Sequence, residues 1–338
     1  MTHEFKNIVN EAQNAAKKGV KSVLASVVAL DGSSYRRPGV RMLILENGSM
    51  IGAVSGGCVE KEILLQSESV FSSGVSKIMT YDGRYRLGCE GVLYILLEEF
   101  APDEAFYDTF QNCLTQRHVF RLQSFCYKKT GIFKTIGTQV LINNKLYKLS
   151  KFEISEAQKE HAVFEQLMTP CFKLLIIGAE HDAVQLCQFA ALTGWEVTII
   201  SGVSESKSIS DFPGASGFQT VSAESLDVKS IDNQTAIILM THNFAIDLRY
   251  LVTIRETNPC YIGLLGPKRR RADLLSQFIE YCPDIDEAFL ERIHGPAGIN
   301  IGAVTPQEIA ISIIAEILSV IREQEPMPLN RKAGSIHA

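Results

Sequence analysis

The hydrophobic pattern of the chain changes near Pro170. Beyond that residue, short and largely apolar runs alternate with segments of helical period. Such continuous runs are typical of parallel strands that are buried on both faces. They predict strands at residues 172–177, 197–200, 236–241 and 261–265, and the periodic segments predict helices at 181–192, 246–255, 269–281 and 306–322. This alternation predicts a Rossmann-like, doubly wound α/β domain with a parallel sheet over residues 170–322, followed by a flexible tail at 323–338.

The first half of the chain mixes helical and extended patterns without that regular alternation. The Asn47-Gly48 dipeptide between two extended runs is typical of a hairpin turn. Strands are expected at residues 20–30, 42–45, 49–54, 75–81, 92–97, 118–126 and 135–149, and helices at 4–18, 58–73, 103–116 and 158–168. This mixture predicts a small α+β domain over residues 1–168, in which the part from 100 to 168 carries no recognisable chemistry.

Composition and charge narrow the function classes. The 338 residues carry 33 basic and 38 acidic side chains, a net charge of −5, which argues against a nucleic-acid protein that relies on phosphate attraction. The longest apolar stretch, residues 309–321, is too short to cross a membrane and contains Glu316. The amino terminus lacks the apolar region of a signal peptide, so a cytoplasmic protein is expected. The eight cysteines of the chain form no CxxC pair and are expected to stay reduced.

The turn after the first apolar strand of the second half resembles half of a dinucleotide fingerprint. Gly178 and Ala183 fit the pattern, but Glu180 stands where the backbone should approach a diphosphate, and Asp182 adds a second acid. The next apolar strand ends without the acid that would hold a ribose hydroxyl. The sequence therefore argues against NAD(P) bound in the usual pose.

Two histidines and a run of cations follow strands of the same predicted sheet. His181 and His242 should emerge at its carboxyl edge, where ligands of this fold bind. His181 is equally compatible with a solvent-facing helix start, but two histidines at one edge favour a site. Lys268-Arg269-Arg270-Arg271 begins a helix and is compatible with an anion cradle or with a solvated helix face. By contrast, Thr305 and Glu308 form a capping box at the start of the last helix and are expected to be structural.

Three glycine-punctuated loops of the first half gather arginines and cysteines. Their candidate residues are Arg36, Arg37, Arg41, Ser55, Gly56, Gly57, Cys58, Glu60, Arg84, Arg86 and Cys89. Arginines and unpaired amides at a helix start bind anions, and a helix start lowers the pKa of a nearby thiol. For any one loop, the glycines could simply serve turns and Cys58 could pack in a core. The three loops together predict a pocket for an anionic, sulfur-seeking ligand, with Cys58 and Cys89 as candidate thiolate ligands of a soft metal.

The motifs GSSYRRPGVRM, GAVSGGCVE and LGCEGVLYILLE resemble those of the XdhC/CoxI family, the accessory proteins of molybdenum hydroxylases. The later segments IIGAEHDAVQLCQFAALTGWEVTI, THNFAIDLRYL and YIGLLGPKRRR resemble the carboxyl-terminal Rossmann-type domain of that family. The resemblance implies binding of the molybdenum cofactor (molybdopterin), its protection during sulfuration, and its delivery to an apo-enzyme such as xanthine dehydrogenase or carbon monoxide dehydrogenase. Two positions depart from the family pattern: Glu180 replaces a glycine, and Glu90 replaces the fourth residue of the LGCGG motif, which is also a glycine.

These observations predict a cytoplasmic cofactor-binding maturation factor without turnover of its own. The expected partners are a molybdenum hydroxylase apo-enzyme, a cysteine desulfurase and a second copy of the chain in a homodimer. Molybdenum cofactor would contact the loop residues above together with Gly178, His181 and His242. Two alternatives remain open: an NAD(P)-dependent oxidoreductase built on the βαβ unit, and an interaction scaffold that docks a hydroxylase or sulfurtransferase without touching cofactor.

Overall fold

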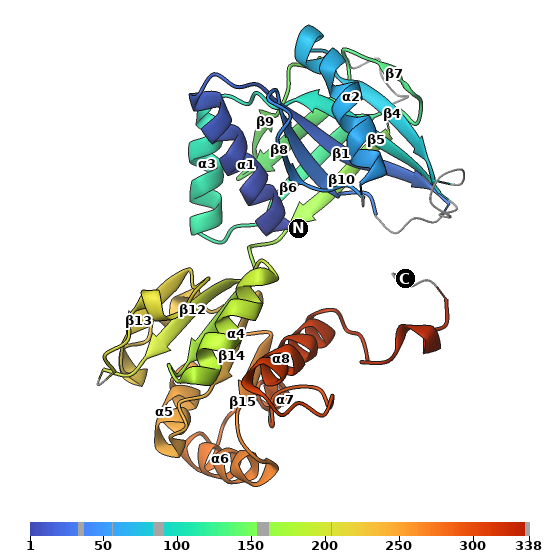
Figure 1. Cartoon of the computed structure of the whole chain (residues 1–338). Helices are drawn as coiled ribbons and strands as arrows, with labels where there is room; N and C mark the ends of the chain where they lie inside the picture. The colour runs from blue at the N-terminus through green and yellow to red at the C-terminus, as the bar shows by residue number, and fades with distance from the viewer. Residues whose placement is uncertain (33–36, 56, 84–90, 154–161, 204, 335–338) are drawn as a thin grey trace. The chain divides into compact units, whose positions relative to one another are not determined.

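The computed structural model divides the chain into two compact units, Met1–Pro170 and Cys171–Ala338 (Figure 1). It describes all residues except 33–36, 56, 84–90, 154–161, 204 and 335–338. Each unit has its own hydrophobic clusters. Among the described helices, none is long and apolar enough to cross a membrane.

The first unit contains an antiparallel six-stranded sheet in the order β3-β2-β1-β5-β4-β7. Its strands are β1 (Ser22–Asp31), β2 (Arg41–Leu45), β3 (Met50–Gly52), β4 (Lys77–Asp82), β5 (Val92–Glu99) and β7 (Gly131–Ile132). One face of this sheet packs under helix α2 (Cys58–Ser73), whose Val59 and Ile63 are fully buried against Val23 and Ile95. Nearly every residue of β1 is buried, because both faces of the sheet are covered.

The other face of that sheet packs against a second antiparallel sheet and two helices. The second sheet has the order β10-β6-β8-β9. These elements are α1 (Thr2–Lys17), α3 (Glu104–Thr115), β6 (Phe120–Cys126), β8 (Gly137–Ile142), β9 (Lys145–Lys148) and β10 (Ala162–Met168). Aromatic side chains fill the space between them, with the rings of Phe5, Phe106, Phe110 and Phe120 within 5.4–6.1 Å of a neighbour in the cluster.

The prediction of a helix at residues 158–168 is wrong for residues 162–168, the part that the structure describes. Ala162–Met168 is strand β10, and all seven of its residues pair with β6, from Ala162 opposite Cys126 to Met168 opposite Phe120. Gln166 and Met168 alternate toward the core while their neighbours face outward. Pairing with a distant strand outweighs the helix propensity of this glutamate-, glutamine- and leucine-containing segment.

The second unit is built on a parallel six-stranded sheet in the order β13-β12-β11-β14-β15-β16. Its strands are β11 (Lys173–Ile177), β12 (Glu196–Ser201), β13 (Gly217–Thr220), β14 (Thr235–Leu239), β15 (Tyr261–Leu264) and β16 (Ile293–His294). Its helices are α4 (His181–Leu192), α5 (Phe244–Ile254), α6 (Lys268–Tyr281), α7 (Glu287–Glu291) and α8 (Pro306–Ile321). Short 3₁₀ helices lie at Ile209–Asp211, Ala223–Ser225, Val228–Ser230 and Leu329–Arg331.

Helices cover both faces of this parallel sheet. Helices α4 and α8 cover one face, and helices α5 and α6 cover the other (Figure 1). The strand order reverses between β11 and β14, the topological switch point at which doubly wound folds bind ligands. The prediction of an α/β chain with an α+β first half and a Rossmann-like second half is confirmed. Its basis is physical: the apolar runs are continuous because each central strand is buried on two faces.

Candidate functional site

The strands that flank the three loops with arginines and cysteines have the corresponding ends at one end of the six-stranded sheet. The register places Asp31 at the end of β1 opposite Val92 at the start of β5, which also faces Asp82 at the end of β4. Arg41 begins β2 at this end, and β3 ends here at Gly52, opposite Met42. The antiparallel topology therefore brings the strand ends that flank residues 32–40, 53–57 and 83–91 to the same end of the sheet, although they are far apart in the sequence.

The start of α2 is held by Glu60. Its carboxylate accepts hydrogen bonds from the backbone amides of Ser55 at 2.5 Å and Gly57 at 2.6 Å. Burial raises the pKa of the Glu60 carboxyl, but these backbone hydrogen bonds lower it by more, so its pKa lies below the ordinary value. Glu60 therefore stays ionised and fixes the glycine turn. An anionic ligand would have to use other donors, because two of the amides at this helix start already hold a carboxylate.

Arg41 points into the core of the first unit instead of toward the loop end. Its side chain is only 7% exposed, and Nη1 donates to the carbonyl of Gly39 at 2.9 Å and to Oε1 of Gln166 at 2.5 Å. Burial lowers the pKa of Arg41 to about 10, against the opposing influence of Glu98. The guanidinium thus ties the turn before β2 to β10, and the sequence could not reveal this because Gln166 is 125 residues away.

The other candidates of these loops are only partly within the described structure. Arg37 is exposed beside the turn at residues 38–39, and Cys58 is the first residue of α2, although the Cys58 side chain lies outside the described atoms. Arg36, Gly56, Arg84, Arg86 and Cys89 lie outside the described residues. Among the described side chains, no three His, Cys, Asp or Glu residues come together as a metal site.

At the switch point of the second unit, the turn after β11 packs closely against the end of β14. Gly178 has φ +130°, and a Cβ on it would lie 2.4 Å from the carbonyl oxygen of Met240, so only glycine fits. The next residues carry the two acids. Glu180 lies 3.7 Å from Nζ of Lys207, and the same ammonium donates to the carbonyl of Ala179. Lys207 comes from the segment after β12, which the sequence did not connect to this turn.

His242 and His181 have different surroundings. His242 follows β14 with a left-handed φ of +56°, and its Nε2 lies 3.9 Å from Oδ2 of Asp182, so it links the two loops that border the switch point. His181 is the exposed first residue of α4. The structure therefore brings His242 and Asp182 together. Two carboxylates at this edge disfavour a diphosphate in the position that the fingerprint would give it.

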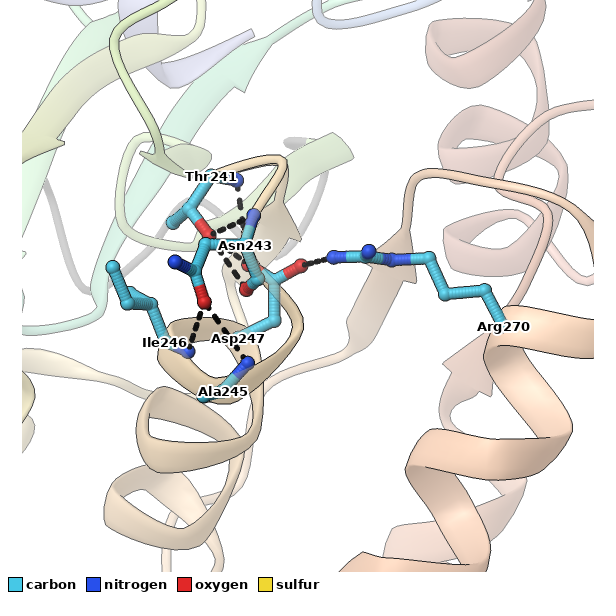
Figure 2. A network of polar contacts seen from close by, with 6 residues as sticks. All are labelled: Thr241, Asn243, Ala245, Ile246, Asp247 and Arg270. Atoms are coloured by element: carbon cyan, nitrogen blue, oxygen red, sulfur yellow. Dashed lines mark hydrogen bonds and ion pairs between the residues drawn. The ribbon is translucent and has the colours of Figure 1, made fainter.

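A buried polar network fixes the loop that carries His242 (Figure 2). Asp247 is 2% exposed, and its Oδ1 accepts from the Thr241 hydroxyl at 2.7 Å and from the Thr241 amide at 3.3 Å. Its Oδ2 accepts a hydrogen bond from Nη2 of Arg270 at 2.6 Å. Asn243 caps α5 by accepting from the amides of Ala245 and Ile246. The link between Asp247 and Arg270 was not anticipated, because the sequence gives no distance between two helices.

This network also bears on the run of cations at the start of α6. Arg270 binds Asp247, Arg271 donates to the carbonyl of Ile293 at 3.1 Å, and Arg269 lies 3.9 Å from Asp273. Only Lys268 makes no hydrogen bond or ion pair within the described part of the chain. Three of the four cations are thus engaged within the fold and do not form a shared anion cradle.

Comparisons with known proteins agree with this architecture. Residues 15–82 match the model of the XdhC and CoxI family, and residues 174–317 match the model of the XdhC Rossmann domain. A probable xanthine dehydrogenase subunit of Bacillus subtilis is 28% identical over 88% of this chain and 92% of its own length. The Escherichia coli molybdenum cofactor insertion chaperone PaoD is 26% identical over 96% of this chain and 91% of its own length.

A crystal structure from Bacillus halodurans, described as a xanthine dehydrogenase, shares the fold. It superimposes with a TM-score of 0.76, covers 95% of this chain and 98% of that chain, and is 23% identical in sequence. Both units of the chain therefore have counterparts in known proteins, and the two family models together match more than half of it. The chain belongs to the XdhC/CoxI family.

Proposed function

We propose that this chain is an accessory factor that binds the molybdenum cofactor, supports its sulfuration and delivers it to the apo-form of a molybdenum hydroxylase. The name of the E. coli relative, a molybdenum cofactor insertion chaperone aligned over nearly the whole chain, supports this assignment. The observation that carries it is the strand register, which brings the strand ends flanking the three loops to one end of the sheet.

The chemistry of the loops suits such a cargo. Molybdopterin carries a phosphate and a metal bound by dithiolene sulfur. Arg37 with Arg36 and Arg84 would hold the phosphate, since guanidinium groups bind phosphate oxygens with two parallel hydrogen bonds. Cys58 and Cys89 would offer soft thiolate ligands to the molybdenum. In this proposal Glu60 and Arg41 would not contact the cofactor, because their side chains are engaged within the fold. Their role is to hold the loops, through the amides of residues 55 and 57 and through the Gly39 carbonyl.

The test of this function is a delivery assay. Protein loaded with molybdenum cofactor is mixed with apo-xanthine dehydrogenase, and the activation of the enzyme is followed with and without a cysteine desulfurase and cysteine. We expect faster activation than with free cofactor at the same concentration, and a lower yield with Cys58→Ala or Cys89→Ala. Cys282→Ala, which changes a half-buried thiol of the second unit, is the matched control. Activation at the rate of free cofactor would contradict a delivery role.

A second candidate function, an NAD(P)-dependent oxidoreductase, is favoured by the strand order of the second unit alone. That order is the one of dinucleotide-binding sheets. The acids Glu180 and Asp182 at the switch point argue against it. A fluorescence titration with NADH and NADPH separates the two functions. Micromolar binding would favour the oxidoreductase, whereas a cofactor-delivery factor with these acids should show none.

A further inference from the structure

A pocket of about 650 Å³ opens at the carboxyl edge of the second unit's sheet, away from the switch point. Its walls come from the residues that follow β15 and β16 and from the first turns of α8. This volume lies within the range of small-molecule sites. Most of the lining is apolar, and Leu265, Ile299, Ile301 and Ile309 are its largest apolar side chains. Ile301 is half exposed at this site.

The wall formed by residues 296–303 is held in place before any ligand arrives. Glu316 of α8 accepts a hydrogen bond from the amide of Gly298 at 2.7 Å, and the hydroxyl of Ser312 donates to the carbonyl of Ile299 at 2.5 Å. Glu316 is itself fixed by the hydroxyl of Tyr261 and lies 3.6 Å from His294. Preformed walls bind ligands more tightly, because the entropy of ordering them is not lost on binding.

Among the described residues that line the pocket, Lys268 is the single charged one. Lys268 is also the one cation of the run 268–271 that the described fold leaves without a partner. Asn300 supplies the only other free polar side chain of this described lining, since the hydroxyl of Ser312 is engaged with Ile299. The site thus combines an apolar surface, one amide and one positive charge.

We propose that this pocket binds a phosphorylated heteroaromatic compound of mononucleotide size. The flat ring would lie against the isoleucine side chains and be recognised by Asn300, and the phosphate would face Lys268. A dinucleotide in the usual pose of this fold would instead lie at the turn after β11, where Glu180 and Asp182 oppose its diphosphate. The proposal concerns the second unit alone and does not depend on the cysteine loops.

The test uses the full-length chain with AMP, GMP and CMP as probes and the corresponding nucleosides as unphosphorylated controls. Binding is measured by calorimetry, and amide chemical shifts locate the site. At least one nucleotide should bind about tenfold more tightly than its nucleoside, in line with a charge-assisted contact to phosphate. Lys268→Gln should remove that difference. Arg269→Gln is the matched control, since Arg269 is the neighbouring cation, is 92% exposed and does not line the pocket.

Three results would overturn the proposal. The first is that none of the three nucleotides binds at millimolar concentration. The second is that Lys268→Gln and Arg269→Gln weaken binding equally, which would indicate only a general charge effect. The third is that shifts appear at residues 179–183 and not at 296–303, which would place the ligand at the switch point. Cys58→Ala should leave nucleotide binding unchanged, so failure of this proposal is distinguishable from failure of the cofactor-delivery function.

Discussion

Arg41 and Glu98 are two opposite charges buried on the same face of the first unit's six-stranded sheet, and we predict that they are strongly coupled. Arg41 is 7% exposed and Glu98 fully buried. Burial raises the pKa of Glu98, while hydrogen bonds from Ser150 and Thr138 and the charge of Arg41 oppose the rise. Nε and Nη2 of Arg41 and Oε1 of Glu98 make no hydrogen bond within the described structure. Each charge therefore depends on the field of the other.

The magnitude follows from this burial. Removing one member of a buried pair costs about 3–5 kcal/mol, because the remaining charge is left uncompensated in a medium of low dielectric. Arg41→Met and Glu98→Gln should each fall in that range, and Arg41→Met also loses the bonds to Gly39 and Gln166. The double variant should cost about 1–3 kcal/mol less than the sum of the single variants, because no uncompensated charge remains. Glutamine at position 98 can still accept from Thr138 and Ser150.

Chemical denaturation of the four proteins of this cycle measures the coupling. Far-UV circular dichroism follows the whole chain, and fluorescence of Trp195, the only tryptophan, follows the second unit as an internal control. The substitutions should shift the dichroism transition and leave the tryptophan transition in place. If the double variant is destabilised by the sum of the two single costs to within about 0.5 kcal/mol, the coupling is refuted. A cost below about 1 kcal/mol for Arg41→Met would refute the claim that its charge is buried and needed.

The same pair makes a prediction about pH. A carboxyl whose pKa is raised on folding binds more protons in the native state, so its contribution to stability is greatest at low pH and is lost as the pH rises through the folded pKa. Loss of Arg41 should raise the pKa of Glu98 further. The stability gap between wild type and Arg41→Met should therefore narrow as the pH is lowered from about 8 to about 5. A stability difference between wild type and Arg41→Met that stays constant over this pH range would contradict the conclusion that Glu98 causes the pH dependence.

Three further predictions concern the second unit. Asp247→Ala should destabilise that unit by about 2 kcal/mol, because it leaves Arg270 without its partner, and the Trp195 transition should report the loss. Gly178→Ala should cost about 2–4 kcal/mol in the same assay, since its Cβ would collide with the carbonyl of Met240 at a positive φ; an effect below about 0.5 kcal/mol would contradict the close approach. Burial raises the pKa of Glu316, but hydrogen bonds from His294, Tyr261 and Gly298 lower it by more. Glu316→Gln should therefore destabilise the second unit by about 1–2 kcal/mol at neutral pH. The difference in stability between wild type and Glu316→Gln should disappear as the pH falls below about 4.

The four central strands of the second unit could be predicted from their apolar runs, but its edge strands β13 and β16 could not. In the first unit most strands could be predicted as well, and the failures within the described residues are β7 and β10. Residues 172–177 and 236–241 are largely apolar because each strand is buried on both faces, and that signal is local. The strand at 162–168 has no such signal, since it becomes a strand only by pairing with residues 120–126. The sequence could not give the strand order either, because pairing is set by contacts between distant segments.

The candidate site was predictable in its residue types but not in their orientation. Arg41 looks like a loop cation in the sequence, yet it lies opposite Ser26 on the inner face of the sheet. Glu60 looks like part of a binding motif, yet it caps the helix that Cys58 begins. The spacing of Gly57 and Glu60 matches that of an N-cap and its third helical residue, a signal that would have identified the cap.

The affinity of the purified chain for molybdenum cofactor tests the central claim most directly. Cofactor is titrated into wild type, Cys58→Ala, Cys89→Ala and the control Cys282→Ala, and the dissociation constants are compared. We predict saturable one-to-one binding by wild type and by Cys282→Ala, with affinity at least tenfold lower when either loop cysteine is replaced. Equal affinity in all four proteins would remove the thiols from the site, and no saturable binding by wild type would contradict the proposed function.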